Sequence, residues 1–198
     1  MMLLYSPGSP YARKARIVLR EKGLLPQVEE IVVNPHENGA ELLALNPLAK
    51  VPALHCDDGA VFDSPLICEY LDGLSSEARL IPAGGMERLE VLRRQALADG
   101  IMDAAVASVL ELRRTDTAPS KHWMNRWEAA ISRATQVLST ASLPSAIRLD
   151  GIAVGCALAY LAYRQPHIDW QRSHPSLKSW YDRYVDRPSF HDTKPPDL

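Results

Sequence analysis

Strand and helix signals alternate between Met2 and Leu74, and helical patterning alone follows. The expected strands cover residues 2–5, 27–33, 51–55 and 60–62, and the expected helices cover 10–22, 38–45 and 63–74. Parallel neighbours in a sheet need a helical crossover, whereas antiparallel neighbours need only a turn. The order βαβαββα therefore predicts a small mixed sheet covered by helices, an α/β domain.

The second half of the chain repeats apolar residues at helical spacing over 86–114 and again from Trp127 to Leu138. Residues 152–163 are apolar nearly all round, which predicts the central helix of a bundle. A last helix is expected at 175–186, with Pro188 as its stop. We expect an α/β domain at 1–76, a breaker-rich linker at 77–86 and an all-helical domain at 87–198.

Composition excludes several classes of function. The 198 residues carry a net charge of −2, which leaves no basic footprint for nucleic acid. The longest uncharged apolar run, Gly151 to Tyr163, is 13 residues, whereas a membrane span needs about 20. No basic-then-apolar leader opens the chain. We therefore expect a cytoplasmic protein with no membrane segment. We also expect no metal site, because the three cysteines are widely spaced.

Ser9-Pro10 follows the first predicted strand and opens the first predicted helix. Serine is a preferred N-cap residue and proline is favoured at the first helical position, so a purely structural role accounts for this pair. The same geometry suits chemistry, because a hydroxyl at a helix N-terminus can donate a hydrogen bond to a bound thiolate or oxyanion. The basic residues of this helix, from Arg13 to Lys22, are expected on a solvated face or in a patch near a bound anion, rather than at a nucleic-acid site.

Two further proline-marked sites lie downstream. Pro52 falls inside a strand signal, where proline cannot donate to the ladder, so the pattern fits either a cis Val51–Pro52 bond or an edge strand with trans proline. Asp63-Ser64-Pro65 is a second capped helix start. Its serine and amide groups could hold a carboxylate, and Asp63 could accept from an ammonium group.

In order, these motifs resemble the cytosolic glutathione transferase family, and its bacterial serine-type members in particular. The resemblance rests on the Ser-Pro helix start, the run Asn46-Pro47-Leu48-Ala49-Lys50-Val51-Pro52, the Asp-Ser-Pro helix start, the Leu80-Ile81-Pro82 linker and the helical second half. It implies a thioredoxin-like first domain, an all-helical second domain and a homodimer. It also implies glutathione as co-substrate.

The resemblance assigns roles to particular residues. Ser9 would hydrogen-bond the glutathione sulfur, Lys50 would meet the glycine carboxylate, and Val51, before Pro52, would pair with the cysteinyl amide. Asp63 and Ser64 would bind the γ-glutamyl ammonium and carboxylate groups. The resemblance also implies that Asp99 reaches a γ-glutamyl group across the dimer. From their positions on the predicted helix faces, Tyr11, Met102, Val106 and Tyr160 are expected to line the pocket for the electrophile.

The implied activity is transfer of glutathione to a small hydrophobic electrophile, in detoxification. The alternatives are a glutathione-dependent isomerase, dehalogenase or reductase, or a non-catalytic adaptor that kept the fold. Tyr5 and Ser6 compete with Ser9 for the role of the activating hydroxyl. A serine at position 9 disfavours mixed-disulfide chemistry, because serine does not attack disulfides usefully.

One stretch departs from the family pattern. Relatives commonly begin the buried core helix with Ser/Thr-x-x-Asp, a capping box, whereas this chain has Arg148 and Gly151 at the two key positions. The reciprocal cap is therefore expected to be absent, and Asp150 is the candidate to satisfy the helix N–H groups in its place.

Overall fold

The computed structural model describes residues 1–195 and divides them into two compact units. The first unit comprises Met1–Ala83 together with residues 187–195, and the second comprises Gly84–Asp186. The first unit is a four-stranded mixed sheet with helices, and the second is helical, so the predicted fold class is confirmed. The units divide at residues 83/84 and 186/187, whereas the sequence grouped all of 87–198 in one domain.

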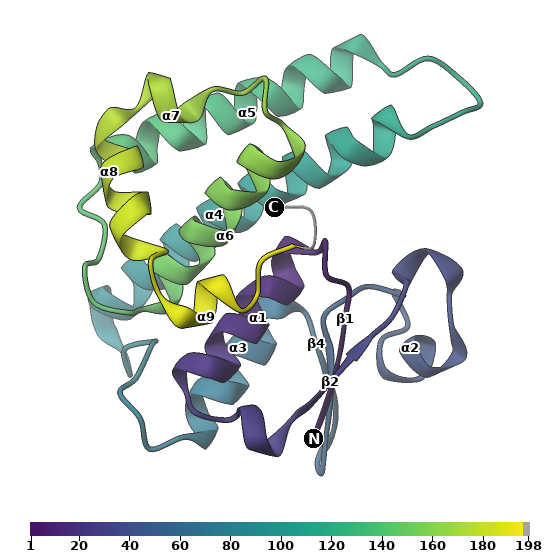
Figure 1. Ribbon diagram of the computed structural model, residues 1–198, viewed down its shortest axis with the longest axis vertical. Helices are drawn as coiled ribbons and strands as arrows, with labels where there is room; N and C mark the ends of the chain where they lie inside the picture. Colours follow the sequence, from purple (N-terminus) through teal and green to yellow (C-terminus); the bar gives the residue numbers. More distant parts are fainter. Residues whose placement is uncertain (196–198) are drawn as a thin grey trace. The chain divides into compact units, whose positions relative to one another are not determined.

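The sheet of the first unit has the order β2-β1-β3-β4. Strand β1 (Met2–Tyr5) pairs in parallel with β2 (Glu29–Val32) and antiparallel with β3 (Ala53–Cys56), which pairs antiparallel with β4 (Gly59–Phe62). Helices α1 (Pro10–Glu21) and α3 (Ser64–Leu74) cover one face of the sheet. The short helix α2 (Ala40–Leu45) covers the other (Figure 1).

Alternation along β1 separates the two faces of the sheet. Leu4 packs with Leu42 and Ala53 in the core beneath α2, and Leu3 is buried on the opposite side. Two strands begin later than the sequence predicts. Pro26 lies in a 3₁₀ turn, Leu25–Gln27, before β2, and Pro52, which has no N–H for the ladder, precedes β3.

The expectation that the basic residues of α1 form a solvated face is wrong. Arg13 donates from Nη2 to the carbonyl of Phe190 at 3.0 Å, and Arg16 donates from Nε to Glu30 at 2.6 Å. The Lys22 ammonium lies 3.0 Å from the buried carboxylate of Asp72. These cations are buried because each finds a carbonyl or carboxylate acceptor that is remote in sequence.

The C-terminal stretch belongs to the first unit through these contacts. Pro188 was expected to stop the last helix, but it begins a separate short helix, α9 (Pro188–His191). Besides Arg13, Glu21 of α1 contacts this segment, accepting a hydrogen bond from the Ser189 hydroxyl at 2.5 Å. A proline at the first helical position has the required φ angle and needs no hydrogen bond from its nitrogen, so it can start a helix as well as end one.

The second unit is a bundle of α4 (Gly85–Leu112), α5 (Lys121–Thr140), α6 (Leu149–Arg164), α7 (Trp170–Ser173) and α8 (Pro175–Tyr184). Helix α6 is its buried centre and packs along α4. Among residues 1–195, no helix combines the length and apolarity that a bilayer crossing requires.

The start of α6 is held without the family's capping box. Arg148 supplies no side-chain cap, and its backbone N–H donates to the Tyr184 hydroxyl at 3.0 Å. Asp150 does not cap the helix either, because its fully buried carboxylate pairs with Arg94 at 2.5 Å. The Tyr184 ring packs against Gly151, where a Cβ atom would lie 2.3 Å from Tyr184 Cζ and Oη.

Replacing Gly151 with alanine is therefore expected to destabilise the protein. The new methyl group would displace a buried ring that also holds the α6 N-terminus, at a cost of about 1–3 kcal/mol for overpacking. A shift of about 5 °C in Tm is expected for a chain of this size. Thermal unfolding followed by circular dichroism measures it.

The matched control is Gly100→Ala in the middle of α4. A Cβ atom at Gly100 meets nothing within 4 Å, and alanine has the higher helix propensity. This variant is expected to unfold at the same temperature as the native protein or slightly above it. Equal Tm values for the two variants would contradict the proposed packing of Tyr184 on Gly151.

Candidate functional site

Three segments meet at one edge of the sheet because of the strand register. Leu4 pairs with Ala53, and Ala53 pairs with Phe62. The carboxyl end of β1, the amino end of β3 and the carboxyl end of β4 therefore lie side by side. Ser9 comes after Tyr5, Val51-Pro52 come directly before Ala53, and Asp63-Ser64 come directly after Phe62. The three segments that the sequence singled out therefore lie at this edge.

Ser9 is the N-cap of α1, as the sequence predicts. Its Oγ accepts a hydrogen bond from the Ala12 N–H at 3.2 Å, and Pro10 occupies the first turn. Because Oγ acts as an acceptor in this bond, its proton remains available for donation. The start of α1 offers fewer amide donors than expected, since proline has no N–H and the Ala12 N–H is taken by the cap. Any anion here would rely mainly on the hydroxyl.

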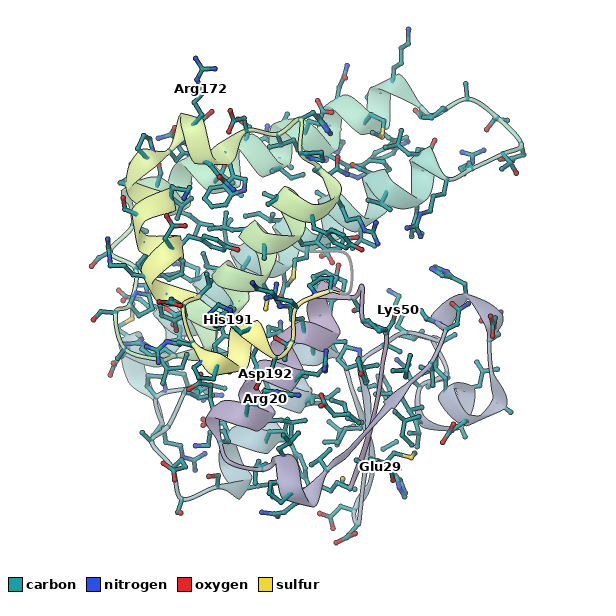
Figure 2. All side chains as sticks on the ribbon, in the orientation of Figure 1. Arg20, Glu29, Lys50, Arg172, His191 and Asp192 are labelled. Carbon is teal, nitrogen blue, oxygen red and sulfur yellow. The ribbon has the colours of Figure 1, made fainter. Side chains whose placement is uncertain are left out.

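The loop before β3 is shaped by Asn46, which sequence reasoning overlooked. Its buried side chain donates from Nδ2 to the Lys50 carbonyl at 2.8 Å and accepts from the Leu48 N–H at 3.0 Å. An Asn-Pro turn was the available signal, since asparagine commonly bonds backbone groups two residues on. The loop carries Lys50 at its end (Figure 2). The Lys50 ammonium is exposed and forms no ion pair with residues 1–195.

The peptide bond between Val51 and Pro52 is cis, which is one of the two alternatives left open by the sequence. Val51 itself precedes the strand and stands outside its ladder. Within the described chain, no strand neighbour therefore occupies its backbone N–H and C=O groups.

The start of α3 differs from the capped start that the sequence predicts. Asp63 occupies the N-cap position with φ at +72°, a strained conformation for a residue with a side chain, and its carboxylate makes no cap hydrogen bond. The Asp63 side chain is exposed. Ser64 is only 2% exposed, and its Oγ has no hydrogen-bond partner in the part of the chain that the structure describes. Strained backbone and unsatisfied buried hydroxyls are both uncommon, and they coincide here.

Tyr5, one of the competing hydroxyl residues, is occupied by another contact. The guanidinium of Arg16 lies 4.1 Å from the centroid of the Tyr5 ring, a cation–π arrangement. Arg16 in turn bonds Glu30, and although burial tends to raise the pKa of that carboxyl, the hydrogen bonds from Arg20 and Arg16 leave it below its ordinary value. This chain of contacts directs Tyr5 toward α1.

The edge thus combines charges of both signs with unpaired hydrogen-bonding groups. Lys50 offers a cation, Asp63 an anion, and the uncapped α3 N-terminus a partial positive charge. Ser9 and Ser64 each have a hydroxyl proton to donate, and Val51 has unpaired backbone groups. Such a set complements a small zwitterionic peptide that carries an ammonium group and carboxylates.

The remaining predicted residues are distributed over both units. Tyr11 is partly exposed on α1 in the first unit, whereas Met102, Val106 and Tyr160 belong to α4 and α6 of the second. Asp99 is partly buried on α4 and accepts a long hydrogen bond, 3.5 Å, from Gln95 Nε2. Over residues 1–195, no group of three or more His, Cys, Asp or Glu side chains is placed to hold a metal ion.

Comparison with known proteins shows which family the chain resembles in sequence. Residues 8–74 match the sequence profile described as the glutathione S-transferase N-terminal domain. The chain is 34% identical to the uncharacterized GST-like protein YibF of Escherichia coli K12, over 99% of both chains. It is 33% identical to maleylacetoacetate isomerase of Pseudomonas aeruginosa, over 62% of this chain and 61% of that protein.

The fold also matches a solved structure. A glutathione transferase family member from Pseudomonas fluorescens Pf-5, crystallised with bound glutathione, superposes with a TM-score of 0.94 at 39% identity and covers 98% of each chain. The likenesses to YibF and to the Pseudomonas fluorescens protein cover 98–99% of the chain, so this chain belongs to the glutathione S-transferase family.

Proposed function

We propose that this protein is a glutathione transferase that binds reduced glutathione along the sheet edge and transfers it to a small electrophile. The observation that carries the proposal is the start of α3, where neither the buried Ser64 hydroxyl nor the neighbouring Asp63 carboxylate has a partner among residues 1–195. A γ-glutamyl group has the matching carboxylate and ammonium. Lys50 would meet the glycine carboxylate, and Val51, before Pro52, would pair with the cysteinyl amide.

The reaction requires the thiolate of glutathione. A free thiol has a pKa of about 8.5, so only a few per cent is ionised at pH 7. A hydrogen bond from the Ser9 hydroxyl, assisted by the positive end of α1, stabilises the thiolate. Lowering the thiol pKa by about two units corresponds to about 2.7 kcal/mol, a free energy within the range of one charge-directed hydrogen bond together with a helix terminus.

The thiolate then attacks the electrophilic carbon. A C–S bond forms with the electron pair of sulfur, the leaving group departs with the electron pair of its own bond, and the thiol proton passes to solvent. Tyr11, Met102, Val106 and Tyr160 would contact the electrophile. A glutathione-dependent isomerase is the second candidate, because a partial relative is a maleylacetoacetate isomerase. A non-catalytic adaptor is disfavoured, since Lys50, Pro52, Asp63 and Ser64 are all retained.

The family resemblance also supports proposals about the protein's assembly state, location and physiological role. We propose a cytoplasmic homodimer that acts in detoxification, in which Asp99 of one subunit reaches the γ-glutamyl group bound by its partner. An Asp99→Asn substitution would then weaken glutathione binding only in the dimer, and sedimentation at several protein concentrations would give the assembly state for the comparison.

Glutathione binding to the Ser64→Ala variant tests the proposed function. Calorimetric titration of the native protein is expected to give saturable binding in the micromolar-to-millimolar range. Removing the Ser64 hydroxyl takes away a charge-assisted hydrogen bond and should weaken binding about tenfold. The free variant should be as stable as the native protein or more so, because the hydroxyl it loses is buried and unsatisfied.

Ser108→Ala is the matched control for that titration. Ser108 is also a buried serine, but its hydroxyl donates to the Ala104 carbonyl at 2.9 Å inside α4. Its removal should leave glutathione affinity unchanged. The transferase proposal fails if the native protein shows neither heat nor thermal stabilisation at millimolar glutathione.

A further inference from the structure

A segment far from Ser9 in the sequence is bound to the helix that Ser9 begins. Within the first unit, α9 and the residues after it lie along α1 (Figure 1). Three residues of this segment, Ser189, Phe190 and Thr193, are buried and form hydrogen bonds with α1 side chains. We call these three residues the α1 clamp.

The α1 clamp contacts both ends of the helix. At the first turn, the buried Arg13 guanidinium donates from Nη2 to the Phe190 carbonyl at 3.0 Å and from Nε to the Thr193 hydroxyl at 3.4 Å. At the last turn, the Ser189 hydroxyl donates to Glu21 at 2.5 Å. The Thr193 hydroxyl donates to the Ser189 carbonyl at 2.8 Å, which links the two contacts. A buried guanidinium is costly without acceptors, so Arg13 depends on this segment.

Arg13 connects the α1 clamp to Ser9. Its backbone N–H donates to the Ser9 carbonyl at 3.0 Å, and the Ala12 N–H donates to Ser9 Oγ at 3.2 Å. Pro10, which lies between them, has no N–H to add. The ends of helices open more readily than their centres. The first turn of α1 is therefore the part of the helix whose position depends most on an outside contact, and Arg13 supplies that contact.

The position of this turn matters for the proposed chemistry. A hydrogen bond weakens steeply as its distance and angle depart from the optimum, and a donor stabilises a developing charge best when it is already in place. A first turn that moved freely would carry the Ser9 hydroxyl in and out of hydrogen-bond distance of a bound sulfur atom.

We propose that the α1 clamp fixes the first turn of α1 and thereby positions the Ser9 hydroxyl, so that Arg13 and Thr193 are positioning residues for thiolate formation. The effect on the thiol rests on the proposed transferase function. The restraint on α1 is a separate claim about the first unit, and it holds without glutathione. The alternative is that the α1 clamp contributes only to stability, as buried hydrogen bonds generally do.

The variant Thr193→Val tests the effect on the thiol. It removes the hydroxyl, nearly keeps the side-chain shape and leaves the charge of Arg13 in place. The pKa of the bound thiol, followed by thiolate absorbance, is expected to rise by about half a unit. Turnover should then fall about threefold at pH values below the pKa and stay unchanged well above it, because half a unit is a threefold change in thiolate fraction. Glutathione affinity at low pH, where the sulfur is protonated, should change less than about twofold.

The matched control is Thr135→Val in α5 of the second unit. Thr135 is also a buried threonine whose hydroxyl donates to the carbonyl four residues earlier, that of Ile131, at 3.0 Å. The same substitution there should lower Tm by a similar amount and leave the thiol pKa unchanged. Thr193→Ser keeps a hydroxyl and should restore the native pKa. A native thiol pKa in Thr193→Val, or an equal shift in Thr135→Val, overturns the positioning proposal.

Amide hydrogen exchange tests the restraint on α1 without glutathione. The Arg13 N–H, which is bonded to Ser9, should exchange about three- to tenfold faster in Thr193→Val, the change expected for loss of one hydrogen bond. Ser189→Ala releases only the last turn, at Glu21, and should affect this amide less. Thr135→Val should not affect it. Unchanged exchange in Thr193→Val would show that the α1 clamp does not restrain the first turn.

The two measurements together separate this proposal from the proposed function. If exchange at Arg13 accelerates but the pKa of the bound thiol does not move, the α1 clamp contributes only to stability and the positioning proposal fails, while the transferase function stands. If exchange accelerates and the native protein binds no glutathione, the restraint on α1 stands and the transferase function fails.

Discussion

The Ser9→Ala variant is expected to lose turnover about 10- to 100-fold while it retains most of its affinity for glutathione. The lost hydroxyl would donate to the thiolate, which is the reacting form, and a hydrogen bond to a charged group contributes about 1.5–3 kcal/mol. The γ-glutamyl and glycine ends of the tripeptide would still be held elsewhere along the sheet edge. The measurements are kcat with an activated aryl halide and the glutathione dissociation constant.

The thiol pKa gives a second readout for Ser9. Absorbance of the bound thiolate near 240 nm as a function of pH should show a higher pKa in Ser9→Ala than in the native protein. Ser9→Thr keeps a hydroxyl and should restore part of the activity. A loss of equal size in kcat and in affinity, or no loss in either, would remove Ser9 from the role of thiol activator.

Ser9 also caps α1, so its substitution needs a structural control. Loss of an N-cap costs about 1 kcal/mol. Ser120 is the N-cap of α5, where its Oγ accepts from the Trp123 N–H at 3.5 Å. Ser120→Ala should therefore lower stability without altering the pH profile. Tyr5→Phe and Ser6→Ala test the two competing hydroxyls, and a larger effect at either position would move the assignment there.

The second large effect is expected for Asp72→Asn, a change remote from the proposed chemistry. Asp72 is 1% exposed, and its carboxylate accepts from the Lys22 ammonium at 3.0 Å and from the backbone N–H groups of Leu80 and Ile81 at 2.9 and 3.1 Å. An asparagine would leave a buried ammonium without its counter-charge and turn a donor toward a backbone donor. We expect a loss of about 3–5 kcal/mol.

A loss of that size should lower Tm by about 10 °C. Arg79→Ala serves as the control, because Arg79 also faces Asp72 but at 3.8 Å and with a largely exposed side chain. Exposed pairs of this kind contribute about 1 kcal/mol or less. If urea unfolding gave the same free energy of unfolding for both variants, the buried ion pair between Asp72 and Lys22 would contribute no more to stability than the exposed pair with Arg79.

Local sequence signals were sufficient where a residue's role depends on its immediate neighbours. Ser9-Pro10 predicts both the start of α1 and its cap, and the structure confirms each. Gly23 directly follows the predicted helix 10–22 in the sequence, and it adopts φ of +62°, which glycine accommodates without a side-chain clash. The apolar run in 152–163 predicts a buried central helix, and α6 is that helix. These features follow from hydrogen bonding and backbone freedom within one or two helical turns.

Local sequence patterns gave wrong predictions for residues whose contact partners are remote in sequence. The basic residues of α1 look like a solvated face in a linear sequence, yet Arg13 is bound by the carbonyl of Phe190, 177 positions away. Asp63 was expected as an ordinary helix cap, but its backbone geometry turns it away from that role. Asn46 and Arg16 were overlooked because their importance lies in the loop and the ring that they hold.

The sequence by itself determined the order of elements, the mixed sheet followed by a helical bundle, and the positions of the three segments with hydrogen-bonding potential. Only the tertiary structure decided that these segments share one sheet edge and that Ser64 is buried with no hydrogen-bond partner among residues 1–195. It also decided that Arg13, Arg16 and Lys22 are buried with acceptors. Periodicity and capping are local properties of a chain. Strand register and the pairing of buried charges depend on contacts between residues far apart in it, which no local pattern encodes.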